Sequence, residues 1–176
     1  KSFSNAAKFC LVLWHLSIAN TQEKWKLLPA FLRTRGLVKQ HIDSYNFLVD
    51  RELKAILEAN REVKSEADPT WFLEYTDIRV GSPGIEEFSA ERSVTPQECR
   101  LRDLTYSAPI YVNIRYTLGR DKIKEDSNVC IGRIPVMLRS SHCVLNAATM
   151  EDMARLGECP LDPGGYFIIR GVEKVV

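Results

Sequence analysis

The chain has 176 residues, of which 45% are hydrophobic and 27% charged, and its formal net charge is +1 at pH 7. This length and composition exclude a disordered or low-complexity chain and suit one globular domain with a buried core. Near-neutrality points to no particular partner, but residues 65–98 are rich in acids and residues 99–143 are rich in bases. Such blocks predict faces of opposite charge if the fold gathers them.

An apolar stretch over residues 9–19 lies near the start of the chain and is too short to cross a bilayer. Lys1 and Lys8 precede it, so a signal peptide, and with it a small secreted or membrane-attached protein, is one alternative. The chain has 5 cysteines but no CxxC pair, and His142 beside Cys143 lacks the ligand spacing of a zinc site. We therefore predict free thiols in a reducing compartment.

The first predicted element is a helix over residues 37–63, where apolar residues recur at spacings of three and four. We expect ion pairs on its exposed face between Asp50 and Lys54 and between Glu58 and Arg61. The apolar stripe of this helix is expected to pack on the core of the domain. It consists of Val38, Ile42, Tyr45, Val49, Leu53, Ile56 and Leu57.

A strand and a short helix are predicted next. Residues 71–81 alternate between apolar and polar and predict a strand, and the SPG sequence that follows predicts a turn. Thr95 is followed by Pro96 and, three residues after the threonine, by Glu98, which is a capping-box signature. We therefore predict a short helical turn through residues 99–102.

The middle of the chain predicts two further strands. Residues 110–119 alternate in polarity, as in a half-buried strand, and residues 119–128 are polar and predict a loop or hairpin tip. Residues 131–138 predict a second apolar strand. Pro135 interrupts it, which places this strand at an edge or a bulge.

The end of the chain predicts a short helix and then β structure. Thr149 is the expected N-cap of a helix over residues 149–157. Residues 166–169 form an apolar run that is expected to be buried on both faces, and residues 166–176 resume β structure. A long helix followed by strands with short helical inserts is an α+β arrangement.

The adjacent glycines Gly164 and Gly165 do not match a phosphate-binding loop. They lack the lysine and hydroxyl of a P-loop, and they come before a strand, whereas the glycines of a dinucleotide fingerprint follow one. Pro163 presets φ for a turn and glycine tolerates positive φ. The sequence therefore predicts a structural turn at this position.

Nucleophiles and acids also fail to indicate a catalytic site. His142 and Cys143 are adjacent, so on a strand they would face opposite sides and could not form a dyad. Asp121, Glu125 and Asp126 lie among lysines in the predicted loop and are expected to be solvated. We predict no catalytic residue, no metal ligand and no cofactor in this chain.

A cluster of bases is the best candidate for a binding function. Arg115, Arg120, Lys122 and Lys124 lie at one strand end and its loop, with tyrosines interleaved, and could grip phosphates. We select Arg120, Lys122 and Lys124 as the nucleic-acid contacts. The residues alone thus predict an α+β domain without an evident active site, and a free-standing nucleic-acid-binding module is one hypothesis.

Four sequence blocks resemble the second-largest, β-like subunit of DNA-directed RNA polymerases, in the order of that family. They are GLVKQHIDSYNFLVD, CRLRDLTYSAPIYVNI, IGRIPVMLRSSHCVL and ECPLDPGGYFIIRGVEKV. The form nearest to this sequence is that of nuclear RNA polymerase III, because of Trp25 with LLPAF, Leu161 and Val172. The corresponding subunits of polymerases II and I remain alternatives.

The resemblance implies the first part of the protrusion domain, an α+β unit that lines the DNA cleft during synthesis of small RNAs such as transfer RNA and 5S ribosomal RNA. It implies nucleotidyl transfer by the whole enzyme, with magnesium held by the largest subunit, and an inactive fragment here. The implied partners are the largest subunit, the other polymerase III subunits, the DNA template and the RNA transcript, with no membrane. The implied compartment is the nucleus.

The resemblance also implies domain boundaries. Residues 1–22 form an apolar leader that matches nothing in the family, and residues 23–176 match the first part of the protrusion domain. The turn and strand around Gly164 and Gly165 are then expected to lead into a domain that continues beyond Val176.

Overall fold

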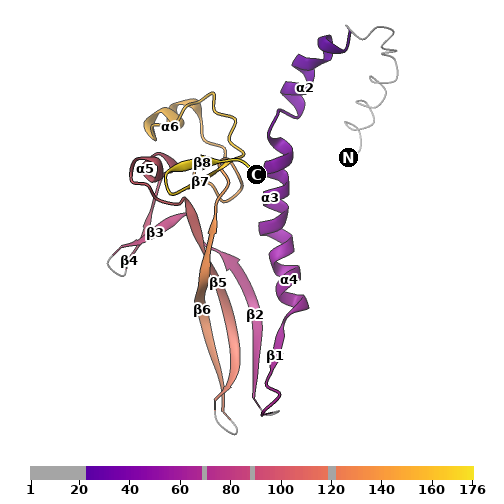
Figure 1. Cartoon of the computed structure of the whole chain (residues 1–176), viewed down its shortest axis with the longest axis vertical. Helices are drawn as coiled ribbons and strands as arrows, with labels where there is room; N and C mark the ends of the chain where they lie inside the picture. The colour runs from indigo at the N-terminus through magenta and orange to yellow at the C-terminus, as the bar shows by residue number, and fades with distance from the viewer. Residues whose placement is uncertain (1–22, 69–70, 88–89, 119–121) are drawn as a thin grey trace. The chain divides into compact units, whose positions relative to one another are not determined.

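The computed structural model describes residues 23–68, 71–87, 90–118 and 122–176 (Figure 1). The predicted apolar leader, residues 1–22, lies outside them. The chain divides into two compact units, Lys1–Leu37 and Val38–Val176. In chain order the elements are η1 (Glu23–Leu27), α2 (Leu28–Thr34), α3 (Lys39–Phe47), η2 (Leu48–Glu52), α4 (Leu53–Ala59), β1 (Glu62–Lys64), β2 (Phe72–Val80), β3 (Gly84–Glu87), β4 (Ala90–Ser93), α5 (Pro96–Leu101), β5 (Ser107–Leu118), β6 (Lys122–Pro135), α6 (Met150–Arg155), β7 (Phe167–Ile169) and β8 (Val172–Lys174).

In the first unit, the 3-10 turn η1 continues into α2, which has a proline in its first turn. Large apolar side chains of both elements are exposed, including Trp25 of η1 and Phe31 of α2. Gly36 ends the segment with a φ of 65°, a value that glycine adopts without strain.

The second unit begins with the predicted helix, which differs from expectation at its middle and its end. The π-helical turn η2 separates α3 from α4 and carries Val49 into the core. The helix ends at Ala59, where Asn60 caps it by donating from its side-chain amide to the carbonyl of Ile56. The prediction of helix up to residue 63 is wrong, because Glu62–Lys64 pairs with β2 and ladder hydrogen bonds replace helical ones.

The apolar stripe of this helix is only partly buried. Tyr45 and Val49 are buried with Met137 in a small cluster, and Ile42 and Leu53 pack beside them. Ile56 is 52% exposed. A π-helical turn holds an extra residue, so the stripe downstream of it rotates away from the core.

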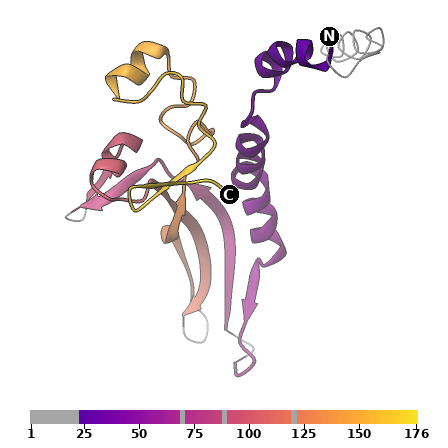
Figure 2. The same ribbon diagram turned by 45° about the horizontal axis from the view of Figure 1, so that its top comes forward.

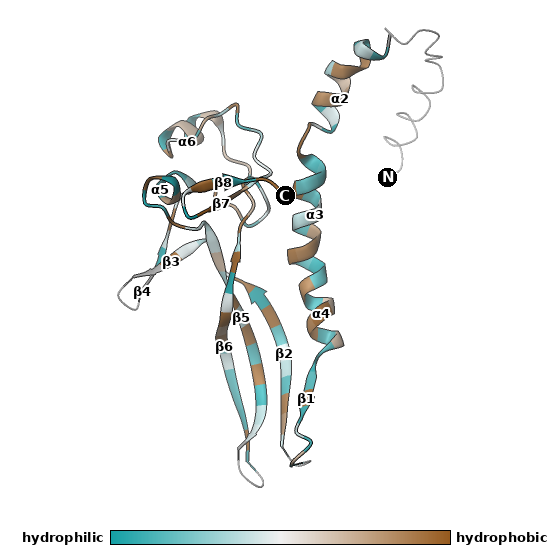
Figure 3. Cartoon of the chain, in the orientation of Figure 1, coloured by the Kyte–Doolittle hydropathy of each residue, from teal (hydrophilic) through white to brown (hydrophobic). Residues whose placement is uncertain are grey.

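A four-stranded antiparallel sheet in the order β1-β2-β5-β6 carries most of the second unit. The strands predicted over residues 71–81 and 110–119 are confirmed as β2 and β5. The loop or hairpin tip predicted over residues 119–128 is too long, because β6 already starts at Lys122, opposite Leu118. Figure 3 shows this first half of β6 as largely hydrophilic. This part of the strand is held by backbone hydrogen bonds to β5. Its sequence does not alternate between apolar and polar residues, so the strand was not predicted there.

Two bulges of the sheet lie side by side at Asn113. The register shifts in β2 between Tyr75 and Asp77, and in the β5–β6 pair on either side of Asn113. The Asn113 carbonyl accepts a hydrogen bond from the Thr76 hydroxyl, and its side-chain oxygen accepts one from the Asn128 backbone. This residue thus satisfies donors from both bulges, which re-aim the strands beyond it.

The main core lies at the end of the sheet away from Leu118 and Lys122 (Figure 1). Figures 1 and 2 show α5, α6 and the β7–β8 hairpin gathered there. The buried residues of this core are Val94, Cys99, Tyr106, Ala108, Val136, Leu138, Cys143, Leu145 and Ile168. The backbone N–H of Tyr106, before β5, donates to the carbonyl of Ile168, and the N–H of Leu138, after β6, donates to that of Tyr166. These bonds attach the β7–β8 hairpin to the ends of β5 and β6. Cys99, Cys130, Cys143 and Cys159 are free thiols, as predicted, and Cys10 lies outside the described residues.

The two short helices begin at the predicted caps. The Thr95 hydroxyl accepts from the backbone of Glu98, and α5 follows. The Glu98 carboxylate pairs with Arg92 and Arg102 rather than closing the capping box. In α6 the box is complete, between Thr149 and Asp152.

The predicted glycine turn is confirmed, with φ values of 70° at Gly164 and 79° at Gly165. The apolar run after it is less buried than expected. Only Ile168 is fully buried, while its neighbours in β7 are half-buried and pair with the exposed strand β8. Among the described residues, no helix combines the length and apolar character needed to cross a membrane.

Ser140 is a buried polar residue that offers a direct test of this packing. Its side chain is 0% exposed, and its hydroxyl has no hydrogen-bond partner among the residues that the structure describes. A buried hydroxyl without a partner costs about 1–3 kcal/mol. Ser140→Ala is therefore expected to raise the free energy of unfolding by about 1 kcal/mol in urea denaturation.

The neighbouring Ser141→Ala variant is the matched control. The Ser141 hydroxyl donates to the side-chain oxygen of Asn46 at 3.1 Å, so its removal is expected to lower stability slightly. A loss of stability in Ser140→Ala as large as in Ser141→Ala would contradict the packing at Ser140.

Candidate nucleic-acid interface

Two of the three predicted nucleic-acid contacts lie together on one strand. Lys122 and Lys124 are exposed residues of β6, and residues two apart on a strand point to the same face. Tyr116 of β5 stands opposite Lys124 in the register. Arg120 lies outside the described residues. The face that carries Lys122, Lys124 and Tyr116 is named here the hairpin face.

Lys124 is already engaged by its neighbours on the hairpin face. Its ammonium lies 3.2 Å from a carboxylate oxygen of Asp126 and 5.8 Å above the ring of Tyr116. The Tyr116 hydroxyl donates to Asp126 at 3.0 Å. Hydrogen bonding to Tyr116, and then to Asp126, raises the pKa of Lys124. Lys122 forms no such ion pair with any described residue, so it is the more available cation.

The remaining bases of the predicted cluster are placed elsewhere. Arg115 is adjacent to Tyr116 in β5 and faces the other side of the sheet, where its Nε lies 2.9 Å from Glu74. Arg61 reaches the same carboxylate, with its Nε at 2.8 Å, in place of the predicted pair with Glu58. The hydrogen bond from Arg115, and further bonds and charge from both arginines, lower the pKa of Glu74.

Two further arginines, Arg133 and Arg139, make hydrogen bonds within the fold. The Arg133 guanidinium donates to the carbonyl of Gly84 and, at 3.2 Å, to the hydroxyl of Ser107. Arg139 donates to the carbonyl of Pro160 at 3.2 Å. The structure therefore brings together only part of the basic cluster that the sequence indicated.

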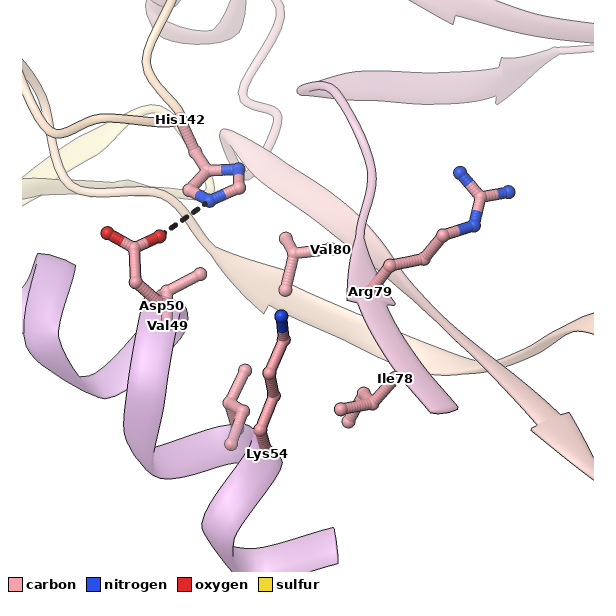
Figure 4. A pocket seen from close by; sticks show the side chains of 8 residues that line it. Val49, Asp50, Lys54, Ile78, Arg79, Val80 and His142 are labelled. Atoms are coloured by element: carbon pink, nitrogen blue, oxygen red, sulfur yellow. Dashed lines mark ion pairs between the residues drawn. The ribbon is translucent and has the colours of Figure 1, made fainter. Parts of the chain in front are cut away.

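A pocket that the sequence did not indicate lies where the π-helical turn meets the end of β2 (Figure 4). Its volume is about 200 Å³. Val49, Leu53, Ile78 and Val80 give it an apolar lining, and Asp50, Lys54, Arg79 and His142 add charge or polarity. The π-helical turn that places Asp50 here leaves no signature in hydrophobic spacing, so sequence reasoning missed the site.

His142 connects the loop after β6 to the helix. Its Nε2 lies 3.5 Å from an oxygen of Asp50, so Asp50 meets His142 rather than the predicted partner Lys54. Cys143 is buried, with its sulfur 3.6 Å from the hydroxyl of Tyr106. The prediction that His142 and Cys143 face apart is correct, although they lie in a turn and not on a strand.

Most of the described chain matches a known protein family. The family model described as RNA polymerase beta subunit matches residues 36–176, which include the helix α3–η2–α4 and all strands from β1 to β8. The chain belongs to the RNA polymerase beta subunit family. The residues of the hairpin face and of the pocket all lie within the matched range.

Individual members of the RNA polymerase beta subunit family agree with this match. The chain is 58% identical over 160 residues to DNA-directed RNA polymerase III subunit rpc2 of Dictyostelium discoideum, with 90% of this chain and 10% of the relative covered. It is 53% identical to polymerase III subunit RPC2 of Drosophila melanogaster, covering 93% of this chain and 14% of the relative. The identity to polymerase II subunit RPB2 of Encephalitozoon cuniculi is 36%, covering 88% and 15%. The chain thus spans between 10% and 15% of the length of these relatives.

Proposed function

We propose that this chain is the protrusion-domain part of the second-largest subunit of RNA polymerase III. The observation that carries the proposal is the 58% identity to a polymerase III relative across 90% of the chain, against 36% for a polymerase II relative. The α+β fold, with one long helix followed by an antiparallel sheet, is consistent with it. The proposed role is to line the DNA cleft during transcription of small RNAs such as transfer RNA and 5S ribosomal RNA.

The proposed partners are the largest subunit, the other polymerase III subunits, the DNA template and the transcript, in the nucleus. Nucleotidyl transfer requires magnesium, whose charge stabilises the reacting phosphate oxygens. Among the described residues of this chain, no group of three or more His, Cys, Asp or Glu side chains could hold such an ion. We propose, as the family resemblance implies, that the largest subunit holds the ion and that this chain has a positioning role.

Affinity purification tests the assembly. A tagged version of the protein that contains this sequence is purified from its own cells, and the associated subunits and RNA are identified. Copurification of subunits found only in polymerase III, with nascent transfer RNA and 5S ribosomal RNA, is expected. Copurification of polymerase II or polymerase I subunits instead would contradict the proposal.

Nucleic-acid contact is proposed for the hairpin face, through phosphates and without base readout. Lys122→Ala is expected to weaken binding of the chain to duplex DNA at low salt. It should reduce the slope of log K against log salt by about 0.9, the contribution of one phosphate contact. Filter binding at several salt concentrations measures both quantities.

Two variants sharpen this measurement. Lys64→Ala removes the same charge from β1, where Lys64 already lies 3.2 Å from Glu62, and is expected to leave the slope unchanged. Asp126→Asn releases Lys124 and removes a negative charge, so it is expected to strengthen binding. Equal slopes for Lys122→Ala and Lys64→Ala would show that Lys122 contacts no phosphate and that the hairpin face is not a nucleic-acid interface.

A further inference from the structure

The pocket of Figure 4 is built from parts of the chain that are far apart in sequence. The turn η2 and α4 supply Asp50 and Lys54, the end of β2 supplies Ile78–Val80, and the loop after β6 supplies His142. Val49, which lies under it, is only 5% exposed. The pocket therefore has an aliphatic floor continuous with the core and a polar rim.

The charges around the rim are not equally available. Asp50 faces His142. The guanidinium of Arg79 lies 4.7 Å from the ring of Tyr111, and its Nε donates to Asn128 at 3.0 Å. Figure 4 shows Arg79 pointing away from the pocket and Lys54 extending into it. Lys54 forms no ion pair or hydrogen bond with any residue in the described part of the chain, so its ammonium is the cation that the pocket offers.

The walls of the pocket are held in place without a ligand. The side-chain oxygen of Asn46 accepts from both the backbone and the hydroxyl of Ser141, at 2.9 and 3.1 Å. Together with the contact between His142 and Asp50, these bonds fix the loop on the helix. A preformed site loses less conformational entropy when a ligand binds.

We propose that this pocket docks an acidic, apolar segment of another polypeptide. A carboxylate of that segment pairs with Lys54, and an adjacent aliphatic or aromatic side chain covers Val49 and Val80. An ion pair beside an apolar wall is screened less than one on an open surface, so charge complementarity selects the partner here.

A nucleic-acid phosphate fits this pocket less well. The aliphatic floor offers a phosphodiester no hydrogen bond in exchange for its hydration, which is costly to lose. Asp50 at the rim also repels further phosphates along a backbone. A peptide can instead place its charge on Lys54 and its apolar side chain on the floor.

The test uses an isotopically labelled sample of the 176-residue chain and nuclear magnetic resonance. The probes are blocked peptides that carry one Glu and one Phe at different separations in a Ser-rich background. Saturable shifts of the Val80 and His142 signals are expected for at least one spacing. Replacing Glu by Gln in that peptide is expected to weaken binding about tenfold or more, which equals about 1.4 kcal/mol.

Variants of the chain locate the contact. Lys54→Glu is expected to abolish the shifts, whereas Lys64→Glu, an equal charge reversal on exposed β1, should retain them. Lys54→Gln replaces Lys54→Glu if the latter loses its dispersed spectrum. The proposal is overturned if no peptide produces saturable shifts at the pocket, or if Lys54→Glu binds as well as the unmodified chain. Stronger binding of inorganic phosphate or short duplex DNA at the same signals also overturns it.

Discussion

Replacing Arg100 by Met is expected to lower the free energy of unfolding of the chain by about 3–5 kcal/mol. Arg100 of α5 donates from one nitrogen to both carboxylate oxygens of Glu158, each at 2.9 Å. The Glu158 side chain is only 3% exposed. Removing the guanidinium leaves that charge buried without its partner, which is the costly way to break a buried ion pair.

The same guanidinium holds three parts of the fold together. Its other nitrogens donate to Glu173 of β8 at 2.8 Å and to the hydroxyl of Tyr166 at 2.9 Å. Burial by itself lowers the pKa of Arg100, but the hydrogen bonds and charge of Glu158 outweigh it, so the pKa is raised above its ordinary value. The arginine therefore stays charged at every pH at which the chain can be studied.

Urea denaturation with two companion variants tests this expectation. Arg102→Met removes an arginine of the same segment whose side chain is 44% exposed, and it is expected to cost less than about 1 kcal/mol. Adding Glu158→Gln to Arg100→Met should recover part of the loss, because the buried charge is then absent. A cost for Arg100→Met no larger than that for Arg102→Met would show that the pair does not stabilise the fold.

Gly164→Ala is also expected to destabilise the chain strongly. Gly164 has a φ of 70°, and a Cβ there would lie 2.8 Å from the carbonyl oxygen of Leu138. That carbonyl accepts a hydrogen bond from Gly165 at 3.0 Å, so it cannot move aside without losing the bond. The expected cost combines about 1–2 kcal/mol for the left-handed backbone with about 1–3 kcal/mol for overpacking.

Gly157→Ala separates these two contributions. Gly157 has a φ of 75°, but the nearest atom to an added Cβ is the side-chain Cγ of Gln97 at 3.4 Å. Only the backbone cost of about 1–2 kcal/mol is expected there. Thermal or urea unfolding of both variants gives the comparison. If the two alanines cost the same, the close approach of Gly164 to Leu138 is not part of the folded state.

Features encoded within a few residues were predicted well. The caps of α5 and α6 follow from Thr95 and Thr149, whose hydroxyls need only the next turn of chain. The turn at Gly164 and Gly165 follows from the backbone freedom of glycine. The bulge in β2 was not predicted, although the apolar residues of this strand change parity between Tyr75 and Ile78.

The candidate nucleic-acid interface was predicted only in part. Lys122 and Lys124 share a face, but they lie on a strand and not in a loop. Polar residues on both faces of β6 hide its pairing, because alternation marks a strand only where one face is buried. Arg115 was grouped with them although it faces Glu74, and the side of the sheet it occupies follows from register.

The sequence by itself determined the α+β class, the local caps and turns, and the polymerase family, because each rests on residue types at short spacing or on blocks in a fixed order. Tertiary structure alone decided where the helix stops, how its π-helical turn rotates Asp50 toward His142, and which lysines remain available. These depend on pairing between segments far apart in the chain. The contact between Asp50 and His142, and the ladder that starts at Lys122, replace the local partners that spacing had indicated.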